Sequence, residues 1–340
     1  MTETVRLTGQ GLEQLLGAAA GATGGLVAPV TEDGQVLFRP VREARRFDYI
    51  NAVTPPKDFW FPQTERLFKF KTVPAVALEQ AADPAQRVVF GVRPCDLKSL
   101  VILDAVMATG EFEDDYYAQQ RSATTVIGVA CTGAGPHCFC TAMGVTPGDE
   151  AGADLMLYPD GDGFLGRAVT GRGAALTAAH AGCFAAADPA AVAAAAAAAR
   201  KLVPPLAGRL DVDGLRERFA DNWDSHIWGE AAQRCLGCGL CTYLCPTCYC
   251  FGVSDEVRQG QGVRMRCWDS CMFSDFVRMA GGHNPRPGKL ERVRQRFLHK
   301  LRYFPARHAE LACTGCGRCV AKCPVGVHVP ELIMLDREAR

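Results

Sequence analysis

Two stretches of this 340-residue chain share one cysteine pattern: CLGCGLCTYLCP at residues 235–246 and CTGCGRCVAKCP at residues 313–324. In each stretch, two residues separate the first three cysteines, and a fourth cysteine follows after three residues and precedes proline. The first three cysteines of such a run hold one 4Fe-4S cluster, and the fourth holds the neighbouring cluster. The sequence therefore predicts a first cluster on Cys235, Cys238, Cys241 and Cys323, and a second on Cys313, Cys316, Cys319 and Cys245.

Zinc and disulfides are the alternative uses of these cysteines. Zinc sites combine two C-x2-C pairs and do not use a run of four that ends in Cys-Pro. The N-terminal segment MTETVRLTGQGLEQLLG lacks the charged-then-apolar pattern of a secretory signal. We therefore expect a cytoplasmic protein, in which most of the 17 cysteines bind metal and do not form crosslinks.

The composition argues against two classes of partner. Lysine plus arginine and aspartate plus glutamate both total 37, so nothing indicates binding to nucleic acid or to an anionic membrane surface. No apolar run reaches the ~20 residues that span a bilayer. The alanine-rich stretch 185–199 contains Asp188 and Pro189 and is expected to form a soluble helix.

The chain divides into two parts of different character. Up to about residue 205, the apolar runs GLVAPV, RVVFGV, TVIGVA and LMLY alternate with helical stretches such as DLKSLVILDAVMATG, which predicts an α/β domain with parallel strand pairing. Pro204 and Pro205 end this part. Residues 206–340 are predicted to form an all-helical dicluster ferredoxin domain. Helices between the two cysteine runs are expected to bring Cys245 to the second cluster and Cys323 to the first.

Four further cysteines predict a third cluster, on Cys95, Cys131, Cys138 and Cys140. Cys95 and Cys131 each end an apolar run, so on neighbouring parallel strands both leave the sheet at its C-terminal edge, where ligand sites of open α/β sheets lie. The PHCFC loop then returns Cys138 and Cys140 to the same place, with alternate side chains pointing the same way. The alternative is that these cysteines are buried as ordinary core residues.

Five cysteines remain, in CPTCYCF, in RCWDSC and in an alanine-rich stretch. Cys248, Cys250 and Cys271 with a fourth ligand form a possible rival or additional site, with Cys267 and His283 close by in the sequence. Cys183 is expected to be inert. Glycines inside both cysteine runs are expected to let the backbone approach the sulfurs, and Arg318 is expected to raise the potential of the second cluster.

The motifs FGVRPCDLKSLVILD, GVACTGAGPHCFC, CPTCYCF, RCWDSCMFSDF and AGGHNPRP, in this order with the two runs, resemble the iron-sulfur β subunit of soluble sulfhydrogenases, which are cytoplasmic nickel-iron hydrogenases. They are also similar to the A subunit of anaerobic sulfite reductase. The resemblance extends from about residue 48 to about residue 330. It implies a non-catalytic subunit that carries electrons in a complex with a large and a small hydrogenase subunit and a flavin subunit that binds NAD(P).

Alternatives to a hydrogenase subunit remain open at this stage. One is the equivalent subunit of a sulfite or polysulfide reductase, and another is a stand-alone ferredoxin-like carrier. A third is an enzymatic role for the N-terminal domain, although a G-x-G-x-x-G fingerprint after a strand, a P-loop and a nucleophile elbow are all absent from the sequence.

Overall fold

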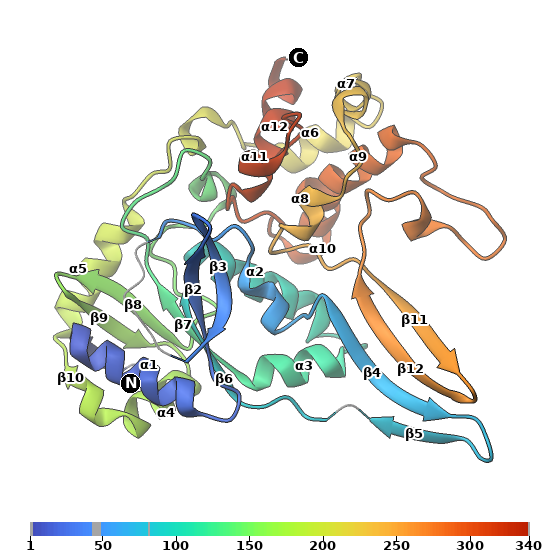
Figure 1. Ribbon diagram of the computed structural model, residues 1–340. Helices are drawn as coiled ribbons and strands as arrows, with labels where there is room; N and C mark the ends of the chain where they lie inside the picture. Colours follow the sequence, from blue (N-terminus) through green and yellow to red (C-terminus); the bar gives the residue numbers. More distant parts are fainter. Residues whose placement is uncertain (1–2, 43–48, 81, 339–340) are drawn as a thin grey trace.

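A large mixed sheet forms the centre of the N-terminal part (Figure 1). The computed structural model describes residues 3–42, 49–80 and 82–338. Residue 1, where the first predicted domain begins, residue 340, where the second ends, and residue 48, where the resemblance begins, lie outside the described residues. The sheet has eight strands in the order β10-β1-β9-β8-β7-β6-β2-β3. Its neighbours β2, β6, β7 and β8 pair in parallel and the outer strands pair antiparallel, which confirms an α/β N-terminal region.

The four apolar runs of the sequence are the four parallel strands. The strands of this sheet are β1 (Thr4–Leu7), β2 (Leu26–Glu32), β3 (Gln35–Val41), β6 (Arg87–Val92), β7 (Thr124–Val129), β8 (Leu155–Asp160), β9 (Gly163–Ala168) and β10 (Phe184–Ala186). β6 pairs with β7 in parallel, with Val89 opposite Val126. Both strands therefore end at the same edge of the sheet, as the prediction for Cys95 and Cys131 requires.

Helices cover both faces of the sheet. They are α1 (Gly9–Gly21), α2 (Pro94–Met107), α3 (Asp115–Ser122), α4 (Gly171–Ala179) and α5 (Pro189–Arg200). Leu15 of α1 packs on one face with Phe90 of β6, whereas Leu97 of α2 packs on the other face with Val89. This alternation follows from the two-residue period of a strand. The alanine-rich stretch forms α5, and no helix within the described ranges is both long and apolar enough to cross a bilayer.

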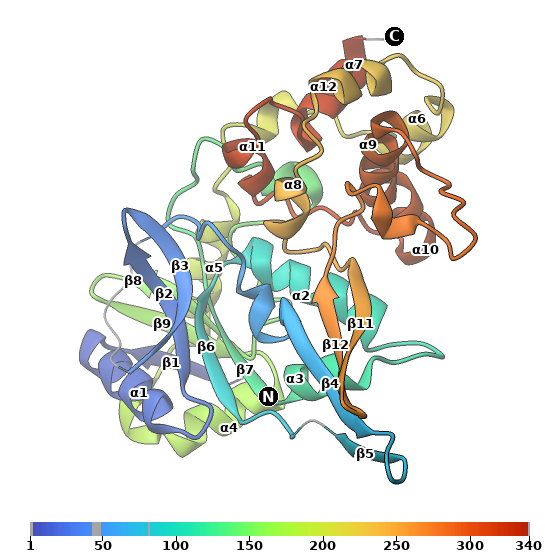
Figure 2. The ribbon, with the colours of Figure 1, turned by 45° about the vertical axis from the view of Figure 1, so that its right-hand side comes forward.

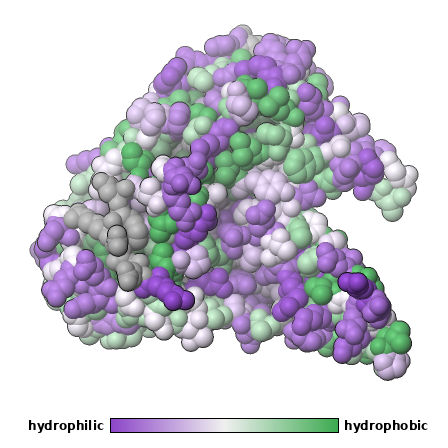
Figure 3. Space-filling view, viewed as in Figure 1, coloured by the Kyte–Doolittle hydropathy of each residue, from purple (hydrophilic) through white to green (hydrophobic). Residues whose placement is uncertain are grey.

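A second sheet forms an arm that extends away from both parts of the chain (Figures 1 and 3). Its strands are β4 (Thr64–Lys71), β5 (Ala77–Gln80), β11 (Phe251–Arg258) and β12 (Gln261–Trp268), in the order β11-β12-β4-β5. The arm thus combines two strands that precede residue 205 with two that follow it. The domain boundary near residue 205 stays a prediction.

The expectation that residues 206–340 are helical throughout is not confirmed, because β11 and β12 form a hairpin there. The two strands are joined at Gln259 and Gly260, which both have positive φ angles, a combination that suits a tight hairpin turn. Every residue of β11 is exposed, so this strand has no buried apolar face that could mark it in the sequence.

The rest of the C-terminal part is helical and lies at the opposite end of the molecule from the arm (Figure 2). Its helices are α6 (Leu215–Asp221), α7 (Ile227–Arg234), α8 (Leu240–Tyr243), α9 (Lys289–Leu298), α10 (Phe304–His308), α11 (Arg318–Lys322) and α12 (Val329–Glu338). Phe219, Trp228, Phe297 and Leu332 pack together in its core. A π-helical turn, His299–Tyr303, joins α9 to α10.

Arg266 connects the arm to the α/β body. Its guanidinium, only 3% exposed, is paired with Glu65 of β4 and with Asp114 at the start of α3. Its plane also lies near Phe61 and Phe251. Because both carboxylates depend on this single cation, its loss leaves buried negative charge without compensation.

We predict that Arg266→Met lowers the free energy of unfolding by about 3–5 kcal/mol, because removing one partner of a buried ion pair is strongly destabilising. The measurement is denaturant unfolding of the anaerobically purified chain, followed by circular dichroism. Arg264→Met is the matched control, since Arg264 lies on the same strand and its pair with Asp255 is exposed. An equal midpoint for the two variants would contradict the assignment.

Candidate iron-sulfur sites

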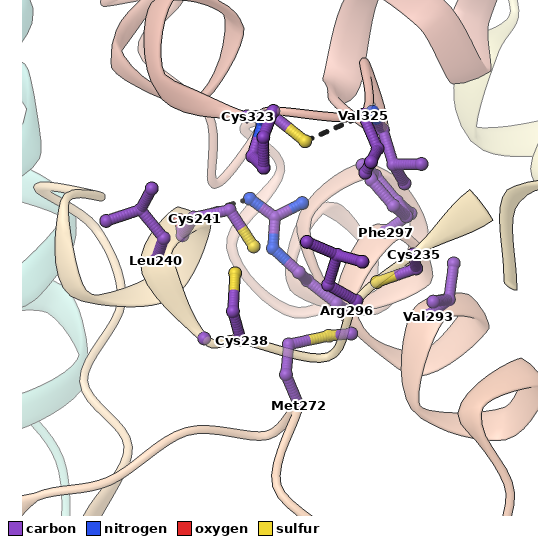
Figure 4. A pocket seen from close by; sticks show the side chains of 14 residues that line it. Cys235, Cys238, Leu240, Cys241, Met272, Val293, Arg296, Phe297, Cys323 and Val325 are labelled. Carbon is purple, nitrogen blue, oxygen red and sulfur yellow. Dashed lines mark hydrogen bonds between the residues drawn. The ribbon is translucent and has the colours of Figure 1, made fainter.

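Four cysteines from the two runs surround one cavity in the helical part (Figure 4). Cys235, Cys238 and Cys241 come from the first run, and Cys323 comes from the second. The Sγ of Cys323 accepts a hydrogen bond from Val327 N–H at 3.2 Å, and the Sγ of Cys235 accepts one from Gly237 N–H at 3.4 Å. Backbone donors thus already point at sulfur, as in iron-sulfur sites.

A second cavity contains the complementary set. It is lined by Cys313, Cys316 and Cys319 of the second run and by Cys245 of the first. Each run therefore sends its fourth cysteine to the cavity formed by the other run. The structure brings together both groups of four that the sequence proposed for the dicluster.

A third cavity lies at the C-terminal edge of the large sheet. It is lined by Cys95, Cys131, Cys138 and Cys140, so all four cysteines proposed for a third cluster converge. Cys95 enters α2 directly after β6, and Cys131 follows the end of β7. The buried guanidinium of Arg93 donates to Ala130 O at 2.8 Å and to Tyr49 O, which holds the two strand ends together.

Two glycines of the second run pack against the PHCFC loop. Gly315 has a φ of 63°, its carbonyl accepts from Phe139 N–H at 2.9 Å, and a Cβ there would lie 2.4 Å from Cys140 Cα. A Cβ on Gly317 would lie 2.4 Å from His137 O. We expected these glycines to let the backbone approach the cluster sulfurs. The structure shows that the missing side chains also allow close packing of the PHCFC loop. This contact places the second and third cavities side by side.

The three cavities form a continuous row. Arg296 lines both the first and the second cavity, and Cys316 lines both the second and the third. Each cavity therefore shares one lining residue with the next.

Comparison with known proteins agrees with this geometry. Residues 234–327 match the model of a 4Fe-4S dicluster domain. The chain is 31% identical over 313 residues to sulfhydrogenase 2 subunit beta of Pyrococcus furiosus, and the match covers 91% of each protein. The chain belongs to the family of sulfhydrogenase β subunits. With its dicluster domain, it is an iron-sulfur electron-transfer protein of the hydrogenase type.

Three buried cations in this family member surround the dicluster cavities. Lys57, Arg296 and Lys300 are 2–4% exposed, and within the described ranges none of them pairs with a carboxylate. Lys57 Nζ donates to Cys248 O at 2.7 Å, and Lys300 Nζ to Thr247 Oγ1 at 2.8 Å. The Nε and Nη1 of Arg296 have no hydrogen-bond partner. Buried cations need compensating anions.

The donor set fits an anionic iron-sulfur cluster in each dicluster cavity. Four cysteine sulfurs converge on each, and the unpaired nitrogens of Arg296 lie between them. Thiolates and the inorganic sulfides of such clusters accept hydrogen bonds and carry negative charge. The cysteine motifs gave no indication of Arg296 and Lys300, for which the basic segment RQRFLHK at residues 294–300 is the available sequence signal.

The cysteine thiols that line the cavities are hard to ionise. Burial raises the pKa of Cys131 and Cys241 to about 11, and the pKa of Cys140 and Cys316 to about 12. At neutral pH these groups carry protons that a metal must displace, since only the thiolate is a ligand. Cluster insertion is therefore coupled to proton release.

Arg318 is compensated by a carboxylate, unlike the three cations. Its guanidinium donates to both oxygens of Asp96 at 2.6 and 2.8 Å, and both side chains are buried. Asp96 follows Cys95 at the start of α2, so this ion pair also joins the second cavity to the third. We expected Arg318 to raise the potential of the second cluster. Its pairing with Asp96 makes Arg296 the stronger candidate for that effect.

The remaining cysteines line none of the three cavities, and the additional site on Cys248, Cys250 and Cys271 stays a prediction. Cys248 contacts Cys245, and Cys250 contacts Cys271. Cys267 lies opposite Gly252 in the hairpin, and His283 is exposed. Cys183 lies in a short turn against the α1 face of the large sheet.

We predict that Arg296→Met lowers the midpoint potentials of both clusters of the dicluster domain by on the order of 50–100 mV, because a nearby positive charge favours the reduced state. EPR-monitored redox titration measures the change. The control is the double variant Asp96→Asn, Arg318→Met, which removes a neutral pair and should shift both potentials much less. Potentials that are unchanged in Arg296→Met would refute this role.

Proposed function

We propose that the chain relays single electrons through three 4Fe-4S clusters. The ligands are Cys235, Cys238, Cys241 and Cys323 for the first cluster, Cys313, Cys316, Cys319 and Cys245 for the second, and Cys95, Cys131, Cys138 and Cys140 for the third. When bound, each cluster supplies one-electron exchange between adjacent oxidation states. The protein supplies the thiolates, the buried cations and the exclusion of water.

The row of cavities is the observation that carries this proposal. A catalytic site needs one place where substrate and acid, base or nucleophile meet. The chain instead places its cysteines around three successive cavities that share walls at Arg296 and Cys316. An arrangement in series suits transport of electrons better than chemistry on a substrate.

Both ends of the row lie close to the surface. Cys238 is the exposed cysteine of the first site, and the neighbouring Leu236 and Leu240 are exposed as well. At the third site Ile50 is 49% exposed and borders a surface depression that also contains Cys138 and His137. These two faces are the proposed points at which electrons enter and leave.

The proposed partners are a small and a large hydrogenase subunit on one side and a flavin subunit that binds NAD(P) on the other, in the cytoplasm. The relative from P. furiosus is named as one subunit of a sulfhydrogenase, which supports an assembly of this kind. The arm also supports an assembly with other subunits, because it exposes apolar side chains to more than half of their surface: Val73, Val76, Leu78, Val253 and Val257. Exposed apolar groups and free sheet edges favour a stable complex over a mobile carrier.

We predict about twelve iron atoms and twelve acid-labile sulfides per anaerobically purified chain. Cys95→Ser and Cys138→Ser should each leave about eight, and the EPR signals of the dicluster should persist because its ligands are untouched. Cys183→Ser should leave about twelve. Eight iron atoms in the unsubstituted chain would contradict the third cluster and would agree with the dicluster alone.

We predict that the chain, isolated anaerobically with its natural partners, is recovered with nickel-containing subunits and that hydrogen bleaches its visible iron-sulfur absorption. Mass spectrometry and metal analysis identify the partners. A sirohaem-containing partner would instead indicate a sulfite reductase, and recovery of the chain alone would indicate a free carrier.

A further inference from the structure

Two cysteines outside the three cavities meet at the base of the arm. Cys250 directly precedes β11, and Cys271 follows the end of β12. The thiol of Cys271 donates a hydrogen bond to the sulfur of Cys250, and the backbone N–H of Cys271 donates to it too. The backbone holds this arrangement, because Asp269 N–H donates to Cys250 O at 2.9 Å. The two cysteines therefore lie within hydrogen-bonding reach of each other across the open end of the hairpin.

This geometry differs from that of a cluster site. Four cysteines line each of the three cavities, whereas Cys250 and Cys271 line none of them and are hydrogen-bonded to each other. Cys248 is also engaged, since its thiol donates to the sulfur of Cys245. Cys250 and Cys271 therefore have the arrangement of a dithiol.

Positive charge surrounds this pair. Lys57 lies on the short 3-10 turn Pro56–Phe59, its Nζ is 3.8 Å from the centre of the Trp268 ring, and its charge acts on Cys250. Lys300 acts on Cys250 and Arg296 acts on Cys271. Nearby cations favour the thiolate, which is the reactive form of cysteine. Hydrogen bonding from Cys271 lowers the pKa of Cys250 to about 7, in the same direction.

We propose that Cys250 and Cys271 form a redox-active dithiol that closes to a disulfide beside the electron relay. Starting from one thiolate and one thiol, each sulfur gives up one electron, the S–S bond forms, and the proton of Cys271 is released. The two electrons leave one at a time to one-electron acceptors of the iron-sulfur class. The inference rests on the proposed function only for these acceptors.

The reaction couples two-electron transfer to one-electron transfer. A disulfide couple exchanges two electrons, whereas an iron-sulfur carrier exchanges one. Closure would also tie the end of the Cys245–Cys250 segment to the segment after β12, and so fix the base of the arm. The pair then stores two electrons when the chain is reduced and stiffens the arm when it is oxidised.

The test is stepwise oxidation of the dithionite-reduced, anaerobically purified holoprotein with ferricyanide, followed by alkylation of free thiols, non-reducing digestion and peptide mass spectrometry. We expect one linked peptide containing Cys250 and Cys271 to appear in a two-electron transition and to disappear on reduction. Iron content should stay constant through this cycle. Absence of the linked peptide at every potential would overturn the proposal.

Three variants separate a dithiol from a cluster ligand. Cys250→Ser and Cys271→Ser should abolish the linked peptide completely and leave the iron content unchanged. Cys267→Ser is the matched control on the same hairpin and should retain the linked peptide. A loss of about four iron atoms in Cys250→Ser would show a cluster ligand and overturn the dithiol, without affecting the assignment of the other clusters.

Discussion

The helical part depends on charge compensation at its centre. Lys57, Arg296 and Lys300 are buried around the dicluster cavities without carboxylate partners in the described ranges. Burial lowers the pKa of Lys57 to about 8, although the Cys248 and Cys245 sulfurs oppose this effect. Such a group of cations is unfavourable unless anions are present. Thiolates and cluster sulfides are the anions that the cysteine cavities can provide, so metal binding and folding of this part are coupled.

The exchange of cysteines between the two runs explains how this part is built. Cys323 crosses to the first cavity and Cys245 to the second, so neither cavity is complete until the segments between the runs have packed. The π-helical turn after α9 carries Lys300, and α9 itself carries Arg296, so one helical segment delivers two of the three cations. The metal sites and the helical core are therefore parts of a single structure.

Sequence patterns predicted the features that repeat or alternate, but not those that depend on distant contacts. The parallel strands were evident because apolar side chains fill both faces of β6 and β7, and the cysteine spacing indicated the convergence of each group of four. β11 was missed because all its residues are exposed. The pairing of Arg318 with Asp96 links residues 222 positions apart, and no local pattern reveals it.

The α/β part supplies the four cysteines of the third cavity, which is a structural role for this large part of the chain. The parallel pair β6 and β7 brings Cys95 and Cys131 to one edge of the sheet, and Gly315 and Gly317 allow the second run to dock there without side chains in between. Cys316 then forms a wall of both cavities. A sheet edge that in many α/β proteins binds a ligand here serves as a support for cysteine sulfurs. In the proposed relay, the α/β part thus adds a third cysteine site to the two of the dicluster domain.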